Sequence, residues 1–236
     1  YRLIMVDEAA QATEPETLVG LCQAELGARV ALIGDHMELP PTVRDRWVAY
    51  AGLEHSLFQR LLEKPGFNTY LLRKQYHMHP SISWWPNQAF YAGELEDDES
   101  THRHWRVGGF PWGQHSAVAL VDVQGREEQR GTSWVNAREA EVVRKIIEGV
   151  RRADGRAVAG IAVLTPYDGQ RRLLTRVLGQ GVEVSSVDAY QGREEDLIIL
   201  SAVIGQRPRG VTAPGHRPLS TIIGHRPHAT AASAFS

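Results

Sequence analysis

The sequence lacks several features that would assign it to common classes of protein. It has a single cysteine, Cys22, which excludes an internal disulfide and is typical of a reducing compartment. No apolar run approaches the ~20 residues that a membrane span needs. The first residues show neither a basic segment nor a small-residue cleavage site. We therefore expect an intracellular protein, nuclear or cytoplasmic, that makes no membrane contact.

Lysine is also scarce, because Lys64, Lys74 and Lys145 are the only lysines among 26 basic residues. None of the three stands in the Gly-Lys-Ser/Thr context of a P-loop. The formal net charge is only −2, so the surface as a whole is not basic. Any contact with nucleic acid must therefore come from a local groove.

Short β-branched runs alternate with helical patterns along the chain, which is typical of a parallel α/β sheet. The runs predict strands over residues 3–6, 30–33, 70–73, 118–123, 160–164, 182–187 and 197–203. Helical spacing predicts helices over residues 15–24 and 53–62, after Pro80, after Asn136 and over 170–178. Asn136 and Glu139 have the spacing of a capping box. The residues expected on one face of the helix that follows are Val143, Ile146, Ile147 and Val150.

Two segments stand apart from this alternation. "ELEDDES", within the loop 94–106, is a charge run of the kind that forms a solvated turn, and we assign it no function. From Gln206 onward the sequence holds four prolines and no acidic residue, and "GHRP" occurs twice. This composition is not expected to build a further sheet layer, so we predict a divergent, disordered tail over residues 206–236.

Acidic residues follow two neighbouring predicted strands. "VDEAAQ" places Asp7 and Glu8 after the first strand, and "ALIGDHMELPPTV" places Asp35 after the second. In a chemical interpretation, Asp7 holds Mg²⁺ through water and Glu8 activates the attacking water. In a structural interpretation, the acids only favour a helix N-terminus. The pairing of two acidic loops favours a ligand crevice at the carboxyl edge of an open sheet.

The most specific stretch is "LLRKQYHMHPSISWWPNQAFYAGEL", residues 71–95. His77 and His79 are either structural or metal ligands, but no third ligand stands at a recognisable spacing. The aromatic residues of the stretch are either core or a base-stacking platform. Further along, Gly192 in "VSSVDAYQGREEDLIILSAV" either lets a backbone N–H approach a phosphate or forms a simple turn.

Five motifs in a fixed order carry a resemblance to one family. They are "DEAAQ" at 7–11, "GDHMELPP" at 34–41, "QYHMHP" at 75–80, "TPYDGQ" at 165–170 and "VDAYQGREEDLIILS" at 187–201. In this order they resemble the core motifs, from motif II to motif V, of the superfamily 1B helicases, the group that includes the nonsense-mediated-decay helicase and senataxin. The resemblance spans about residues 1–205, which makes an unrelated α/β nucleotide-binding domain the weaker interpretation.

The resemblance implies an α/β fold of the P-loop NTPase (RecA-like) type with parallel sheets. Residues 1–68 would be the C-terminal part of a first RecA-like domain, and residues 69–205 most of a second. ATP and Mg²⁺ would bind between them, and single-stranded RNA or DNA would bind across both. Protein partners from an RNA-processing complex are a further expectation.

The resemblance also implies residue roles. Asp7 and Glu8 would handle Mg²⁺ and water, with Gln11 near the γ-phosphate. Tyr76 would stack on the adenine. The implied nucleotide-binding residues are Asp35, Glu38, Gln75, Tyr76, His77, Gly192 and Glu194. The implied nucleic-acid contacts are His36, Pro40, Thr165, Ser186 and Asp188.

The sequence departs from the family where the family binds phosphate. Glu38 replaces a glutamine, and a carboxylate near the γ-phosphate is repulsive by about 4 kcal/mol per unit-charge pair at ~4 Å and an effective dielectric constant of about 20. His77 replaces an arginine and lacks the bidentate fork of a guanidinium group. No P-loop is found. Motif VI is also not recognised, since Arg217 and Arg226 lie in its neighbourhood without its pattern.

Two hypotheses follow. In the first, the chain is a fragment of an ATP-dependent RNA or DNA helicase. In the second, it is a catalytically inactive, truncated or degenerate helicase paralogue that binds nucleic acid or protein. In either case we expect no nucleic-acid-stimulated ATP hydrolysis by these 236 residues alone, even after Glu38→Gln and His77→Arg.

Overall fold

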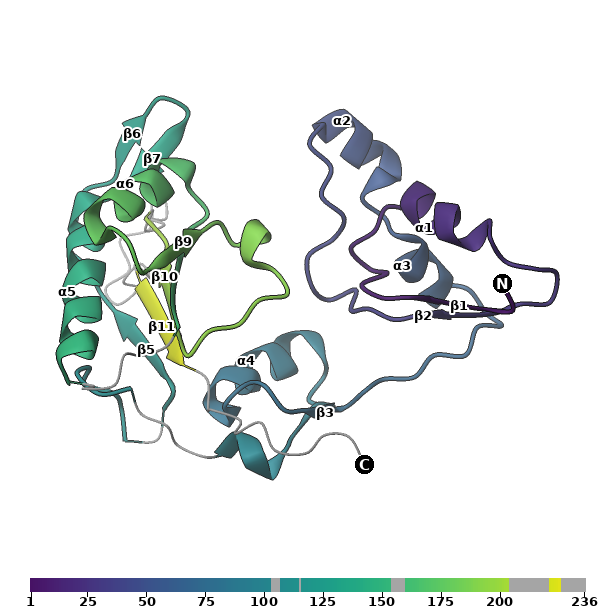
Figure 1. Cartoon of the computed structure of the whole chain (residues 1–236), viewed down its shortest axis with the longest axis horizontal. Helices are drawn as coiled ribbons and strands as arrows, with labels where there is room; N and C mark the ends of the chain where they lie inside the picture. Colours follow the sequence, from purple (N-terminus) through teal and green to yellow (C-terminus); the bar gives the residue numbers. More distant parts are fainter. Residues whose placement is uncertain (103–106, 115, 154–159, 204–220, 226–236) are drawn as a thin grey trace, which may run out of the picture. The chain divides into compact units, whose positions relative to one another are not determined.

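The computed structural model describes residues 1–102, 107–114, 116–153, 160–203 and 221–225, the last five by their backbone alone. The chain forms two compact units, Tyr1–Leu71 and Leu72–Ser236 (Figure 1). The expected domain boundary was residue 68. Within the described ranges, no helix has both the length and the apolar content needed to cross a membrane.

The N-terminal unit is built on two parallel strands, β1 (Leu3–Val6) and β2 (Arg29–Leu32). The first strand lies where it was predicted, and the second begins one residue earlier. Helix α1 (Glu14–Leu21) connects them. It begins with a capping box that the sequence interpretation missed, in which the Thr13 backbone N–H and hydroxyl both donate to Glu16 Oε2, at 2.8 and 2.7 Å.

The predicted helix over residues 53–62 forms only from Leu57 to Leu62, and a helical segment that was not predicted precedes it. A short helix α2 (Arg46–Val48) continues into a π-helical segment, Ala49–Leu53. Helix α3 (Leu57–Leu62) then begins anew, with the Ser56 hydroxyl accepting a hydrogen bond from the Gln59 N–H at 3.1 Å. The break follows from Gly52, whose φ of 101° is incompatible with a continuous helix.

Helix α3 is tied to α1 by a bidentate ion pair. The guanidinium group of Arg60 donates to the two carboxylate oxygens of Glu14, at 2.7 and 2.6 Å. Such forked geometry fixes the orientation of both side chains. The pair thus helps to hold the two helices together across 46 residues of sequence.

The C-terminal unit contains a five-stranded sheet in the order β5-β11-β10-β8-β9. Strands β8, β9 and β10 are parallel, and β11 runs antiparallel between β10 and β5. The bounds of the strands are Val118–Val121 (β5), Ile161–Leu164 (β8), Glu183–Ser185 (β9), Leu197–Ser201 (β10) and Thr221–His225 (β11). The predicted strands at these first four positions are therefore confirmed, although three of them end earlier than expected.

Strand β11 corrects the expectation for the tail. Residues 221–225 were predicted to be disordered, yet their backbone pairs with β10 on one side and with β5 on the other. A strand with a neighbour on each side forms hydrogen bonds along both edges. A run as short as "TIIGH" is therefore long enough to form a stable strand there. The remaining residues of the predicted tail lie outside the described ranges.

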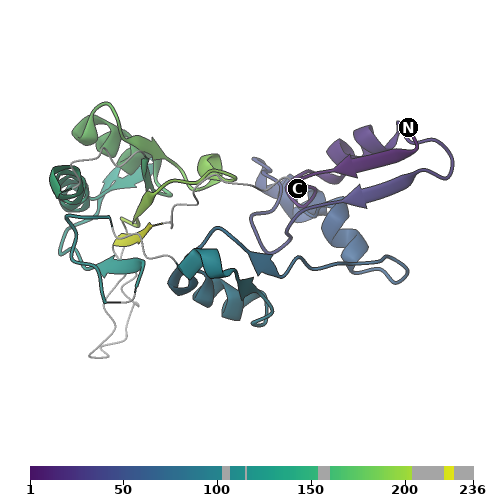
Figure 2. The same cartoon turned by 60° about the horizontal axis from the view of Figure 1, so that its bottom comes forward.

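Helices α5 (Ala137–Ala153) and α6 (Asp168–Leu178) pack against this sheet and enclose its core (Figures 1 and 2). The predicted apolar face of α5 is confirmed, with Val143, Ile147 and Val150 buried and Ile146 packed against them. Facing them from the other elements are Leu174 of α6, Val163 of β8, and Leu197 and Ile199 of β10.

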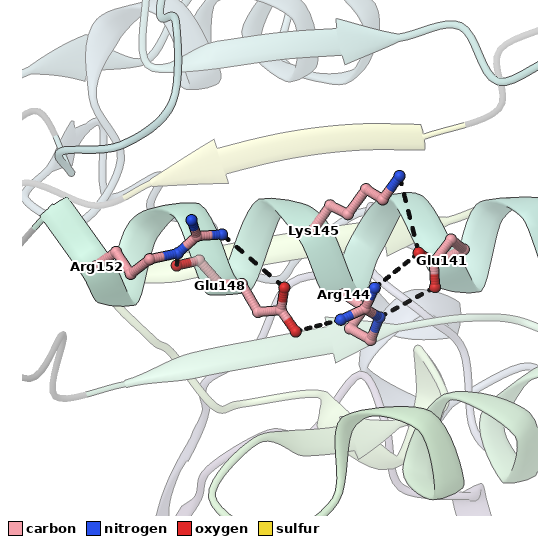
Figure 3. A network of polar contacts seen from close by, with 5 residues as sticks. All are labelled: Glu141, Arg144, Lys145, Glu148 and Arg152. Carbon is pink, nitrogen blue, oxygen red and sulfur yellow. Dashed lines mark hydrogen bonds and ion pairs between the residues drawn. The ribbon is translucent and has the colours of Figure 1, made fainter.

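The outer face of α5 carries a ladder of ion pairs (Figure 3). Arg144 donates two hydrogen bonds to Glu141, at 3.0 and 2.7 Å, and also pairs with Glu148 one turn later. Lys145 and Arg152 extend the ladder at each end. Because these groups are solvated, the ladder supports the helix only weakly and mainly keeps this face polar.

Several short elements complete the C-terminal unit. Strand β3 (Lys74–Gln75) pairs with β4 (Glu96–Asp97), and helix α4 (Pro80–Phe90) lies between them in sequence. The strand predicted over residues 70–73 does not form. Its partner β4 pairs only with residues 74 and 75, and the apolar side chains of residues 70–72 stay exposed. A hairpin of β6 (Glu128–Arg130) and β7 (Ser133–Val135) was not predicted.

A buried polar network joins α5, α6 and β10. The Gln170 amide accepts a hydrogen bond from the Asn136 N–H at 2.8 Å, and donates to the Asn136 carbonyl and to Ser201 Oγ, both at 3.1 Å. Glu139 Oε2 accepts from Ser201 Oγ at 2.6 Å and from the Val203 N–H at 3.1 Å. Asn136 caps α5 as predicted, but Glu139 turns inward instead of completing the capping box.

The buried carboxyl group of Glu139 predicts a pH dependence of stability. Burial raises its pKa above the ordinary 4.5, partly offset by the hydrogen bonds that it accepts. The folded state then holds the proton more tightly than the unfolded state. The free energy of unfolding should consequently fall as the pH rises from 4.5 through the folded pKa. Glu139→Gln should remove this fall.

Hydrogen exchange of the β10 amides, corrected for intrinsic rates and followed between about pH 4 and 8, measures this effect. Glu141→Gln is the matched control on the same helix, because hydrogen bonds from Arg144 lower the pKa of Glu141. A Glu139→Gln variant whose protection varies with pH as in the wild type would contradict the assignment.

Candidate functional site

The structure brings four carboxylates together at one edge of the N-terminal sheet. Asp7 and Glu8 follow β1 directly, and Asp35 and Glu38 lie in the loop after β2. Because the two strands are parallel, their carboxyl ends meet at the same edge. Asp7, Asp35 and Glu38 all act electrostatically on Glu8. This edge is the place where parallel α/β sheets bind ligands.

Close backbone packing holds the acidic edge in place. The Ala9 N–H donates to the Ile33 carbonyl at 2.7 Å, and the Ile33 N–H donates to the Val6 carbonyl at 2.8 Å. A Cβ atom on Gly34 would lie only 2.8 Å from the Ala10 nitrogen. Glycine is therefore required at position 34, since any side chain would push the two loops apart.

Glu8 adopts a left-handed backbone conformation, with φ at 51°. This conformation costs a non-glycine residue roughly 1–2 kcal/mol. Local hydrogen bonds hold it, because the Glu8 N–H donates to Asp7 Oδ1 at 3.0 Å and Gln11 Nε2 donates to Glu8 Oε2 at 2.8 Å. The three residues to which the resemblance assigned catalysis thus form one hydrogen-bonded turn.

The electrostatics of this edge favour a bound cation. Burial raises the pKa of Glu8, and the neighbouring carboxylates of Glu38, Asp7 and Asp35 raise it further. Among the described residues, no group of three or more His, Cys, Asp or Glu side chains is arranged to hold a metal. Mg²⁺ needs no such cage, since it keeps several waters and commonly takes one or two carboxylates together with phosphate oxygens. The acidic edge has the donor type that this mode needs, because Asp7 and Glu8 are carboxylates.

The loop after β2 presents exposed side chains beside this edge. Asp35 Oδ1 accepts a hydrogen bond from the Met37 N–H at 2.8 Å, which fixes the turn. The ring of His36 lies near that of Phe58 in α3, with 6.4 Å between centroids. His36 and Pro40 are both exposed. Their implied contact with nucleic acid is sterically open and stays a prediction.

In the C-terminal unit, Gln75 has a structural role that the motif alone did not indicate. Its amide nitrogen donates to the Met78 carbonyl at 2.7 Å and to Asp97 Oδ1 at 2.6 Å. Its oxygen accepts from the N–H groups of His77 and Met78, at 2.9 and 2.8 Å. Asp97 also accepts from Ser83 at 2.7 Å. The "ELEDDES" stretch is therefore more than a solvated turn, because it anchors this loop.

The residues that follow Gln75 point outward. Tyr76 is 54% exposed, and Lys74 Nζ lies 5.9 Å from its ring centroid. Nδ1 of His77 lies 3.0 Å from a carboxylate oxygen of Glu194, which belongs to the last motif. Three residues with implied nucleotide roles are thus accessible, and two of them, His77 and Glu194, are in direct contact.

The next residues of this stretch divide between structure and surface. His79 is 4% exposed and caps α4, accepting from the Ser81 N–H at 3.2 Å, so the structural interpretation of this histidine holds. Trp84 and Trp85 are 65% and 61% exposed, so they are not core. Trp85 meets Phe90 edge-on, at 5.5 Å between centroids.

The loop that contains Gly192 is shaped by its backbone. Gly192 has φ at 72°, and a Cβ atom there would meet nothing within 4 Å, so the conformation and not the space calls for glycine. Asp188 is exposed, and the Ser186 hydroxyl accepts from the Ala189 N–H at 3.2 Å. Arg193 pairs with Glu183, which fixes the loop against β9.

Thr165 does not lie where the resemblance implied. Its side chain is 0% exposed, and its hydroxyl accepts from the Tyr167 N–H at 3.4 Å. Its N–H donates to the Ser185 carbonyl at 3.1 Å, which continues the pairing of β8 with β9 and draws the residue into the interior. A contact between this side chain and a nucleic-acid backbone is excluded in this conformation.

The buried carboxyl of Glu139 was also missed, although a signal was present. It stands four residues before Val143 and eight before Ile147, on the apolar stripe of the helix. A charged residue on such a stripe is buried together with the apolar residues if the helix already includes it.

Comparisons with known proteins place these features in a family. Residues 1–46 and residues 53–213 each match an AAA domain family. The chain is 39% identical over 226 residues to ATP-dependent helicase upf1 of Schizosaccharomyces pombe, covering 89% of this chain and 24% of that protein. It is 37% identical over 217 residues to ATP-dependent helicase NAM7 of Saccharomyces cerevisiae, covering 86% and 22%.

A further relative is the Regulator of nonsense transcripts 1 homolog of Arabidopsis thaliana, 37% identical over 226 residues, with 89% of this chain and 18% of the relative covered. The chain spans no more than 24% of the length of these relatives. The matches define an AAA-type P-loop NTPase fold, as the resemblance implied. The chain belongs to the superfamily 1B helicases.

Replacing Glu38 should change the titration of Glu8. Among the neighbouring charges, that of Glu38 contributes most to the raised pKa of Glu8. Glu38→Gln should therefore lower the pKa of Glu8, as NMR titration of the carboxyl carbon would measure. Glu63→Gln, which removes the partner of His55, is the control and should have no effect. An unchanged Glu8 pKa in Glu38→Gln would refute the arrangement of the acidic edge.

Proposed function

We propose that the chain is part of an intracellular ATP-dependent helicase that couples nucleotide hydrolysis to movement along single-stranded RNA or DNA. The observation that carries the proposal is the acidic edge, where Asp7, Glu8 and Asp35 meet at the carboxyl ends of two parallel strands. Membership of the superfamily 1B helicases supports it, as does the similarity to upf1 and NAM7, which are both ATP-dependent helicases.

In this proposal Asp7, Glu8 and Gln11, which form the turn after β1, each have a separate role. Asp7 would hold Mg²⁺ through water, and the bound metal would neutralise charge on the phosphate oxygens. Glu8 would accept a proton from the attacking water, for which its raised pKa makes it a better base. Gln11 donates a hydrogen bond to Glu8 and would orient that carboxylate.

The C-terminal unit would contribute contacts to the rest of the nucleotide. Exposed Tyr76 would stack on the adenine, Glu194 would face the ribose, and the Gly192 backbone would approach a phosphate. Single-stranded nucleic acid would contact His36 and Pro40 in the first unit, and Ser186 and Asp188 in the second. Protein partners of an RNA-processing complex belong to the same proposal.

A second candidate function is a catalytically inactive binding module of helicase descent. Two observations favour it. Glu38 adds a negative charge beside Glu8, where a phosphate would have to approach. His77, which replaces an arginine of the family, is engaged with Glu194 at 3.0 Å and lacks a guanidinium fork.

Binding of ADP by the 236-residue chain tests the nucleotide part of the proposal. Tyr76→Ala should weaken binding by about 1 kcal/mol, or roughly fivefold, because it removes an aromatic stacking partner. Saturation-transfer NMR and calorimetry would measure the change. Tyr70→Ala removes an equally large ring that is 87% exposed and serves as control. Equal affinity of the wild type and Tyr76→Ala would contradict the adenine assignment.

A further inference from the structure

The helical arm of residues 44–53 in the N-terminal unit displays two aromatic side chains to solvent. Trp47 is 85% exposed and Tyr50 is 89% exposed. They stand three residues apart on one helical segment, which makes them neighbours on its surface. Neither ring contacts another aromatic ring within the part of the chain that the structure describes. Two adjacent rings this exposed do not belong to the core that the described residues form.

Two exposed arginines flank these rings. Arg44 and Arg46 form no ion pair and no side-chain hydrogen bond among the described residues, whereas Arg60 of the same unit is held by Glu14. Asp45, which lies between them in sequence, is engaged elsewhere, because its Oδ1 accepts from the N–H groups of Trp47 and Val48, at 2.8 and 3.1 Å. Within the described part of the chain, the arm therefore presents two cations without an ion-pair partner beside two rings.

The arm continues the loop that leaves β2, which carries the exposed His36 and Pro40. Its start is fixed by the Asp45 cap and by a hydrogen bond from the Ala49 N–H to the Asp45 carbonyl, at 2.9 Å. Its end is fixed by Gly52, with φ at 101°. The side chains of the arm are thus held on ordered backbone.

We propose that Arg44, Arg46, Trp47 and Tyr50 form a binding platform for single-stranded nucleic acid. Bases would stack on the two rings, and the guanidinium groups would pair with phosphates, a combination that binds a single strand with little sequence preference. The proposal rests on the proposed function, because it adds contacts for the same nucleic-acid substrate. These four residues lie outside the five motifs that carried the family resemblance.

A protein partner is the competing occupant, since Trp, Tyr and Arg are also the residues that dominate protein interfaces. The charge pattern favours nucleic acid. Both cations of the arm lack a carboxylate partner in the described residues, and the only acid between them is committed to the helix N-terminus. A polyanionic backbone complements this arrangement directly.

Fluorescence anisotropy with labelled oligo(U) and oligo(dT) of about 12 nucleotides tests the platform. Trp47→Ala and Tyr50→Ala should each weaken the affinity of the 236-residue chain by roughly tenfold. Tyr70→Ala, whose ring is 87% exposed outside the arm, should leave it unchanged. Circular dichroism would check that each variant is folded.

The arginines are tested by salt dependence. Arg44→Gln and Arg46→Gln should each flatten the slope of log affinity against log salt by about 0.7. Arg29→Gln, on the exposed face of β2, is the control and should leave the slope unchanged. Loss of affinity in the ring variants together with flatter slopes in the arginine variants would support the platform.

The outcomes separate this inference from the proposed function. If the wild-type chain bound neither oligonucleotide, the proposed function would fail and the platform with it. If the wild type bound, but all arm variants bound equally well, only the platform would be overturned. The platform would likewise be overturned if the arm variants lost self-association or a protein partner while keeping their affinity for the oligonucleotides.

Discussion

The parallel pairing of β1 with β2 is the constraint on which the acidic edge depends. It brings the residues after both strands to one side of the sheet, and the missing side chain of Gly34 allows their loops to touch. Within that contact Glu8 is held in a left-handed conformation by Asp7 and Gln11. Backbone strain and like-charge repulsion are both concentrated at this turn. Such costs are typical of functional sites, where a bound cation or ligand would relieve part of the repulsion.

In the C-terminal unit, several motif residues make internal hydrogen bonds that stabilise the fold instead of facing solvent. Gln75 makes hydrogen bonds with every polar atom of its amide inside its own loop. Gln170 and Ser201 join with Glu139 in a fully buried network between two helices and the central strand. The exposed residues beside them, such as Tyr76, are therefore presented from a rigid base. One motif thus combines residues that stabilise the fold with exposed residues that are free to meet a ligand.

Apolar runs with a clear period were enough to predict most of the larger elements, including β1 and α5, because such a period is a local signal. The apolar face of α5 is buried as expected, whereas Leu3 and Met5 of β1 stay exposed. Long-range pairing was not predictable in the same way. Strand β11 exists because β5 and β10 supply two edges, and nothing in residues 221–225 alone specifies that. The contacts of Gln170 with Asn136 span 34 residues and leave no local signature. For the site, the sequence placed the acidic edge correctly, whereas the burial of Thr165 emerged only from the ladder between β8 and β9.

Paramagnetic broadening by Mn²⁺, measured by NMR with ADP present, decides whether the acidic edge of the N-terminal unit binds a divalent cation together with nucleotide. We expect selective broadening of the amide signals of residues 7–11 and 34–38, and its loss in Asp7→Asn. The surface acids Glu141 and Glu148 of α5 provide the internal comparison. Broadening that spares the edge, or that persists unchanged in Asp7→Asn, would show that the cation does not bind there.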